Sequence, residues 1–176
     1  LRVDKIIPTD GVPTGGGGGV IQVTQGSMTT RSQTSSNAYV ASGLSGTITP
    51  KINTSKVLVT VTTSATWDSG AATLGAIIRR KVGGSYLANS PLGSTGHGNV
   101  NTPDGATMGA YDGAGGSQNN QMPMTVQWWD SPATTSAITY ELWMAGNGST
   151  TVGVGGIGDN AGYNIYSQIV MMEVSA

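Results

Sequence analysis

Residues 137–145 read "AITYELWMA", and their strict alternation decides the fold class. Successive side chains of an extended strand point to opposite faces of a sheet. An apolar residue at every second position therefore predicts a strand with one buried face. The apolar side would carry Ile138, Tyr140, Leu142 and Met144, and the opposite side Thr139, Glu141 and Trp143.

The same period of two recurs at Val57, Val59 and Val61. Apolar residues spaced three and four apart, which an amphipathic helix needs, are nearly lacking. Short β-branched segments between glycine- and proline-containing turns predict an all-β fold, an antiparallel β-sandwich rather than alternating β-α-β units. The segments expected as strands are residues 19–25, 44–50, 55–67, 73–82, 122–130, 137–145 and 166–174.

The composition excludes several classes of protein. Charged residues make up 10% of the 176 residues, against about 25% in ordinary soluble domains. No apolar run approaches the roughly 20 residues that span a bilayer, and no basic segment precedes an apolar one as in a signal peptide. The net charge of −1 provides no electrostatic footprint for nucleic acid. We therefore expect neither membrane insertion nor nucleic-acid binding.

The chain contains no cysteine, which excludes thiol catalysis, disulfides and cysteine-type zinc sites. A protein that meets the extracellular environment without disulfides needs another source of stability, and oligomerisation is one.

The first 19 residues differ from the rest, because they hold two prolines, an Asp-Gly turn signal and no strand pattern. We predict an N-terminal attachment arm at 1–19 and a sandwich domain at 20–176. The glycine run that ends the arm is not a phosphate-binding loop, since Val20 and Ile21 follow where lysine and serine or threonine are required. We predict an ordered junction near subunit contacts, where a Cβ would clash. Its residues are Gly15, Gly16, Gly17, Gly18 and Gly19.

Residues 89–121 form the largest cluster of glycine, asparagine, serine and proline. A loop of this length inside a domain is usually functional or disordered, and binding residues are common on loops of rigid scaffolds. We predict a receptor or partner surface here. Its candidate residues are His97, Asn99, Asn101, Asp104, Tyr111, Asp112 and Asn119.

Catalytic, cofactor and metal sites are not expected. The "GVGGIG" of residues 153–158 has dinucleotide-type spacing but lacks the helix and the later acidic residue. His97 is the only histidine, and no serine stands in a nucleophile-elbow context. No pattern pairs two carboxylates as glycoside hydrolysis requires. Trp128 and Trp129 must face opposite sides of a strand, and packing explains them better than carbohydrate stacking.

Four motifs, in this order, resemble small tail-fibre or virion structural proteins of tailed bacteriophages, of the marine and cyanobacterial type. "GGVIQV" (18–23) matches the strand after the arm, and "ITP" (48–50) with "SKVLV" (55–59) matches a turn and strand. "DSPATTSAITY" (130–140) matches a corner whose Asp-Ser-Pro disfavours helix and supplies acceptors for turn amides. "SQIVMMEV" (167–174) matches the closing strand.

The resemblance implies a jelly-roll-like β-sandwich, a homotrimer and no active-site residues. The expected function is that of a non-enzymatic, trimeric tail-fibre or appendage protein, bound to other virion proteins through the arm and contributing to host attachment. Its outward loops would face a host glycan or protein. The chain would be made in the host cytoplasm and reside in the extracellular virion. The alternatives are a capsid decoration protein (cement or head fibre) and, with less support, a glycan-degrading tailspike domain.

Overall fold

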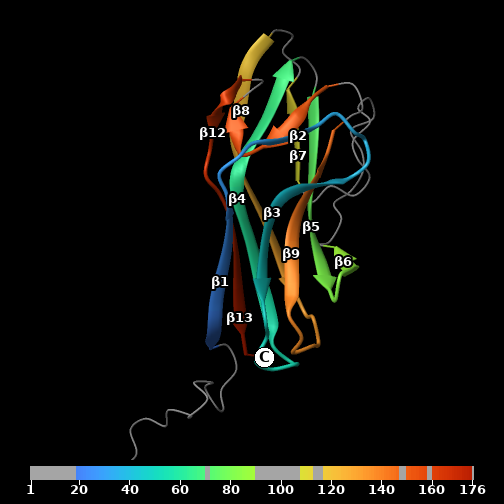
Figure 1. The fold of residues 1–176 in the computed structure, drawn as a ribbon, viewed down its shortest axis with the longest axis vertical. Helices are drawn as coiled ribbons and strands as arrows, with labels where there is room; N and C mark the ends of the chain where they lie inside the picture. The colour runs from blue at the N-terminus through green and yellow to red at the C-terminus, as the bar shows by residue number, and fades with distance from the viewer. Residues whose placement is uncertain are drawn as a thin grey trace, which may run out of the picture.

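The computed structural model describes residues 19–69, 72–89, 108–112, 117–146, 150–157 and 160–175. These residues form an all-β, antiparallel sandwich of two packed sheets (Figure 1). The predicted fold class is thereby confirmed. No helix long and apolar enough to cross a bilayer occurs in these ranges.

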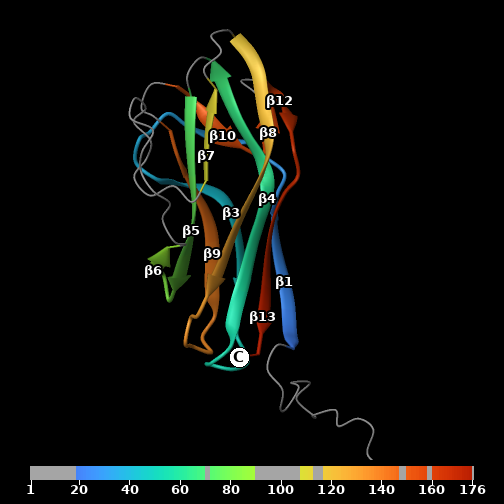
Figure 2. The ribbon, with the colours of Figure 1, turned by 180° about the vertical axis from the view of Figure 1, so that it is seen from behind.

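The first sheet, called sheet A, has the strand order β1-β13-β4-β10-β2, and β8 pairs with the other edge of β4. β4 is 14 residues long and runs the length of the sandwich (Figures 1 and 2). One half of it pairs with β13 and the other half with β10. The bounds are β1 Val20–Met28, β2 Ser32–Thr34, β4 Lys56–Ser69, β8 Ser117–Asp130, β10 Val152–Val154 and β13 Ser167–Val174.

The second sheet, called sheet B, has the order β3-β9-β5-β6, and β7 pairs with β5 beside β6. A separate two-stranded sheet, β11-β12, lies near one end of the sandwich (Figure 1). Strands that pair across a sheet are mostly distant in sequence. The bounds are β3 Val40–Ile48, β5 Ala72–Val82, β6 Ser85–Asn89, β7 Met108–Asp112, β9 Ile138–Ala145, β11 Gly156–Ile157 and β12 Asn160–Asn164.

The core lies between the two sheets, and the predicted alternation places it there. In β9 the four apolar residues are buried, whereas Thr139, Glu141 and Trp143 are partly exposed on the outer side. Val57, Val59 and Val61 are buried from β4, and Ile169 and Met171 from β13. Burial of apolar area is the main driving force for this arrangement.

One long side of the sandwich is closed by direct contact between β1 and β3. The Gln22 side chain donates to the carbonyl of Thr49, and the Thr24 hydroxyl donates to the carbonyl of Thr47. A Cβ on Gly26 would overlap the carbonyl oxygen of Ser45. Glycine is therefore required where the two backbones meet.

All seven predicted strands are present, with ends that differ by up to five residues. Six shorter strands were not predicted, namely β2, β6, β7, β10, β11 and β12. Two strands enter the segment expected to be a loop, because β7 and the first residues of β8 lie inside 89–121. β7 and β8 owe their position to pairing with β5 and β4, which local sequence does not reveal.

Candidate functional site

Glu173, near the end of β13, is a carboxylate with 0% exposure and four hydrogen-bond donors around it. Gln22 Nε2 donates to Oε2 at 2.6 Å. The Ser55 hydroxyl at 2.6 Å and the backbone N–H groups of Lys51 and Ile52 at 2.8 and 3.2 Å donate to Oε1. A buried charge is tolerated when it is satisfied in this way. Glu173 therefore fixes the turn that follows the "ITP" motif to the closing strand.

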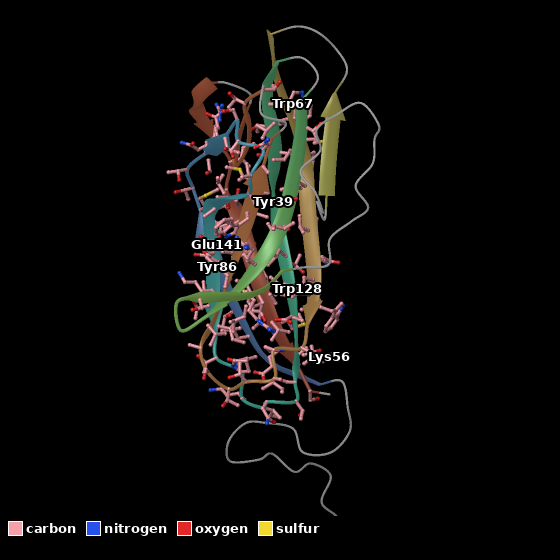
Figure 3. All side chains as sticks on the ribbon, turned by 90° about the vertical axis from the view of Figure 1, so that its right-hand side faces the viewer. Tyr39, Lys56, Trp67, Tyr86, Trp128 and Glu141 are labelled. Atoms are coloured by element: carbon pink, nitrogen blue, oxygen red, sulfur yellow. The ribbon has the colours of Figure 1, made fainter. Side chains whose placement is uncertain are left out.

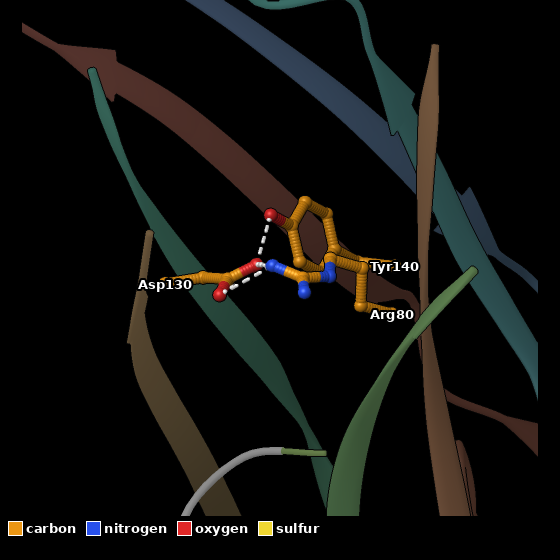
Figure 4. Close-up of polar contacts among 3 residues, drawn as sticks. All are labelled: Arg80, Asp130 and Tyr140. Carbon is orange, nitrogen blue, oxygen red and sulfur yellow. Dashed lines mark hydrogen bonds and ion pairs between the residues drawn. The ribbon is translucent and has the colours of Figure 1, made fainter. Parts of the chain in front are cut away.

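A second carboxylate, Asp130, lies between the sheets at the end of β8 (Figure 4). Arg80 Nη1 of β5 donates to both of its oxygens at 2.8 Å, and the Tyr140 hydroxyl of β9 donates to Oδ2 at 2.7 Å. Burial, and then the negative charge of Asp130, raise the pKa of Tyr140 far above its ordinary value, so that the phenol keeps its proton. The three residues connect sheet A to sheet B.

This arrangement corrects one expectation. Asp130 was expected to accept hydrogen bonds from turn amides, but its donors are Arg80 and Tyr140. In the basic segment "IIRRKVGG" (77–84), the Arg80 side chain is only 15% exposed. The reason is alternation, since Arg80 points inward between the outward-facing Arg79 and Lys81. Within the corner, the Ser136 N–H donates to the Thr134 hydroxyl at 3.1 Å.

The outer side of sheet B carries an aromatic and charged cluster (Figure 3). Glu141 Oε2 accepts hydrogen bonds from the Tyr86 hydroxyl at 2.6 Å and from Trp143 Nε1 at 2.9 Å. The two rings meet edge to face at 5.0 Å, and Arg79 lies 4.3 Å from the Trp143 centroid and 4.9 Å from that of Tyr86. The bond to Glu141 raises the pKa of Tyr86. We name these four residues the sheet B cluster.

The outer side of sheet A is different in kind. Val23, Met172, Leu58 and Trp129 stand in one row across β1, β13, β4 and β8, since each pairs directly with the next. Val23 is 53% exposed and Trp129 is 57% exposed, while the two central residues are half-buried. We name these four residues the outer band. Directly opposed side chains of neighbouring strands touch, so the band is a continuous apolar strip.

The rows beside the band are uncharged apart from one lysine. On one side stand Val20, Val174 and Lys56. On the other side lie two rows of glutamine, threonine, serine and one valine. Within these rows, Gln168 donates to Gln25 at 2.7 Å and Gln127 donates to Thr60 at 3.3 Å. These rows consist of Gln25, Val170, Thr60 and Gln127, and of Ser27, Gln168, Thr62 and Thr125.

In the part of the chain that the structure describes, no group of three or more histidine, aspartate or glutamate side chains could hold a metal ion. The carboxylates of Asp130, Glu141 and Glu173 are each held by internal donors. Residues 153–157 of the "GVGGIG" motif belong to β10, a turn and β11 rather than to a strand-to-helix turn.

The structure describes the backbone of only some predicted contact residues. Tyr111 and Asp112 lie in β7, where they pair with Thr73 and Ala72, and Asn119 lies near the start of β8. Both segments are at the end of the sandwich away from the C-terminus (Figures 1 and 2). His97, Asn99, Asn101 and Asp104 lie outside the described residues.

The predicted glycine junction is described at Gly19 alone, since Gly15 to Gly18 lie outside the described residues. Gly19 is partly buried, its N–H donates to the Ser175 hydroxyl at 3.0 Å, and its carbonyl accepts the Ser175 N–H at 2.9 Å. It therefore adjoins the closing strand, at the same end of β4 as Lys56.

Sequence reasoning missed both outer surfaces. The sheet B cluster joins β5, β6 and β9. Glu141 and Trp143 share one face of β9, but Arg79 and Tyr86 come from other strands, so no local pattern reveals the cluster. The outer band did have a signal. In "SQIVMMEV" the apolar residues occupy both alternating sets, with Val170, Met172 and Val174 on the side expected to be polar. A strand that is apolar on both sides usually has both sides covered.

No protein-family model matches this chain, and no curated protein sequence matches it. Among solved structures, a mutant VP2 protein of infectious bursal disease virus, from derived T=1 particles, aligns with a TM-score of 0.44 and 12% identity. The structure of the Gx strain of the same virus aligns with a TM-score of 0.40 and 14% identity. Both alignments cover 100% of this chain, which spans 41% and 42% of those chains.

Proposed function

We propose that this chain is a non-enzymatic structural protein of a tailed-bacteriophage virion, an appendage component that is anchored at one end and presents the other end to the host. The observation that carries the proposal is the separation of the two ends. Gly19 and Ser175 adjoin the Lys56 end of β4, whereas Ser117 and Asn120 pair with the Ser69 end. Fourteen strand residues separate these ends by about 45 Å.

The motifs behind the bacteriophage resemblance support a structural role. The "ITP" turn and the "MEV" strand meet at the buried Glu173, and the Asp-Ser-Pro corner begins at the buried Asp130. These are anchors of the fold, because the Asp130 carboxylate accepts three hydrogen bonds and the Glu173 carboxylate accepts four. A polar network of this kind favours one rigid arrangement, which suits a particle component better than a reaction site.

The location in the particle is tested by labelling intact virions with an antibody raised against the purified chain. Gold particles at the tail appendages are the expected result. Label distributed over the head would favour the alternative, a capsid decoration protein. A virion role would be contradicted if intact purified virions bind no label and the chain is also absent from the same virions after denaturation. The homotrimer remains a prediction.

The two proposed roles of the ends, anchoring in the virion and contact with the host, are tested with two phage mutants. Removing residues 1–18 should abolish incorporation of the protein. Replacing residues 90–107 by a short glycine-serine linker should leave incorporation intact and reduce adsorption to the host. The replacement stops short of 108–121, because β7 and the first part of β8 pair with β5 and β4. A Ser131→Ala phage, altered at an exposed position of the opposite end, is the control.

A further inference from the structure

We propose that the outer face of sheet A packs against the same face of a second copy of this chain, with the outer band at the centre of the contact. The inference deepens the structural role proposed above, because it names the surface through which copies meet. The contact involves only residues that the structure describes, so it can be tested on the purified chain without reference to the virion.

The outer face of sheet A departs from the expected alternation of apolar and polar residues. An antiparallel sheet with one face in water normally shows polar side chains on that face. Here four apolar side chains cross the whole sheet in one row, and Val20, Val170 and Val174 lie beside them. Two members are more than half exposed. Continuous apolar strips of this kind, bordered by polar residues, mark interaction surfaces.

The composition of this face indicates the identity of the partner. Charge complementarity cannot select a different protein, because Lys56 is the only charged side chain in the rows described above. The polar rows consist mainly of amides and hydroxyls, which both donate and accept hydrogen bonds. Gln25, Gln127 and Gln168 keep unused donors after the bonds that they make within the sheet. Identical faces can therefore satisfy each other.

The position of Lys56 favours a two-fold arrangement. It lies at one end of the face, and Thr62 lies at the other, six residues away along β4. The two-fold axis would lie in the plane of the contact, across the strands and through the middle of the face. Each lysine then lies opposite the far end of the face of the second copy. The two ammonium groups are then separated by about 20 Å, well beyond the Debye length of about 8 Å at physiological salt. An isologous contact of this type is the commonest interface among homo-oligomers.

The extent of the face sets the expected strength. Four strands and seven residues along each strand outline about 19 Å by 23 Å, on the order of 440 Å². Specific interfaces bury about 600–1,000 Å² per partner. The face therefore fits a reversible, concentration-dependent pair rather than a permanent one. Many copies held together in a particle would strengthen it by avidity.

The test is sedimentation equilibrium of the purified chain at increasing concentration, with three single substitutions. Val23→Lys and Trp129→Lys place a charge at the two ends of the outer band, on β1 and β8. Leu87→Lys is the matched control, since Leu87 is an apolar residue 60% exposed on β6 of sheet B. Lysine is well tolerated on exposed strands, and circular dichroism with a thermal melt verifies that each variant is folded.

The wild type and Leu87→Lys should form a dimer, and both band variants should associate at least about tenfold more weakly, which is about 1.4 kcal/mol. A wild type that remains monomeric up to about 1 mM, the weak end of the affinity scale, would overturn the proposal. So would an oligomer that the folded Val23→Lys and Trp129→Lys variants leave unchanged. Neither result would affect the labelling of virions.

Discussion

The aromatic residues on the two outer faces of the sandwich have opposite environments. On sheet B, Trp143 and Tyr86 are packed edge to face, covered by Arg79 and hydrogen-bonded to Glu141. On sheet A, Trp129 is more than half exposed, at the end of an apolar row without such polar partners among the recorded contacts. One face is completed by its own side chains. The other has the composition of a surface that a neighbour completes.

The contrast shows why exposed aromatic residues cannot be interpreted from sequence alone. Trp129 and Trp143 both follow strand alternation and both point outward. What distinguishes them is the neighbouring strands of the sheet, which supply Arg79 from β5 and Tyr86 from β6 in one case and Leu58 from β4 in the other.

The largest effect is expected at Arg80, Asp130 and Tyr140, the three residues that connect sheet A to sheet B. Asp130→Ala leaves the Arg80 guanidinium, only 15% exposed, without its carboxylate. Removing one partner of a buried ion pair costs about 3–5 kcal/mol. Urea denaturation should show a loss of that size in the free energy of unfolding.

Tyr140→Phe is the variant to compare with Asp130→Ala. It removes one hydrogen bond to Asp130 and leaves the ion pair in place, so the expected loss is about 1–2 kcal/mol. If both variants lose the same stability, the ion pair does not carry the connection between the sheets.

A smaller effect is expected on the sheet B cluster. Glu141→Ala removes the acceptor shared by Tyr86 and Trp143. Because the cluster lies on the surface and is partly screened by solvent, the expected loss of stability is about 1 kcal/mol. Association measured by sedimentation should not change. Weakened association would show that sheet B, and not sheet A, contains the contact surface.

The smallest effect is a pH dependence of stability that belongs to Tyr86. The hydrogen bond to Glu141 raises its pKa in the folded protein above the ordinary value of 10.0. Above pH 10 the unfolded chain releases this proton while the folded chain retains it, so stability falls as pH rises. Tyr86→Phe should make this fall less steep between pH 10 and the higher folded pKa of Tyr86, whereas the buried Tyr140, whose pKa is also raised, continues to contribute. An unchanged slope in chemical denaturation at alkaline pH would contradict the assignment.

The sequence predicts the sheets far better than it predicts their surfaces. Alternation in residues 137–145 and 55–61 places the core correctly, because period and burial are local properties. Arg80 and Asp130 are 50 residues apart, and Gln22 and Glu173 are 151 apart. Such pairings depend on strand order, which local pattern does not determine. The apolar outward side of β13 was visible in the sequence, yet its meaning depended on the row that β1, β4 and β8 complete.

The most direct test of the contrast is a reconstruction of the intact particle at side-chain resolution. We expect Trp129 and the outer band to be covered by the sheet A face of a second copy, while Tyr86 and Trp143 face solvent. A particle in which the outer band faces solvent and the sheet B cluster lies in the contact would contradict it.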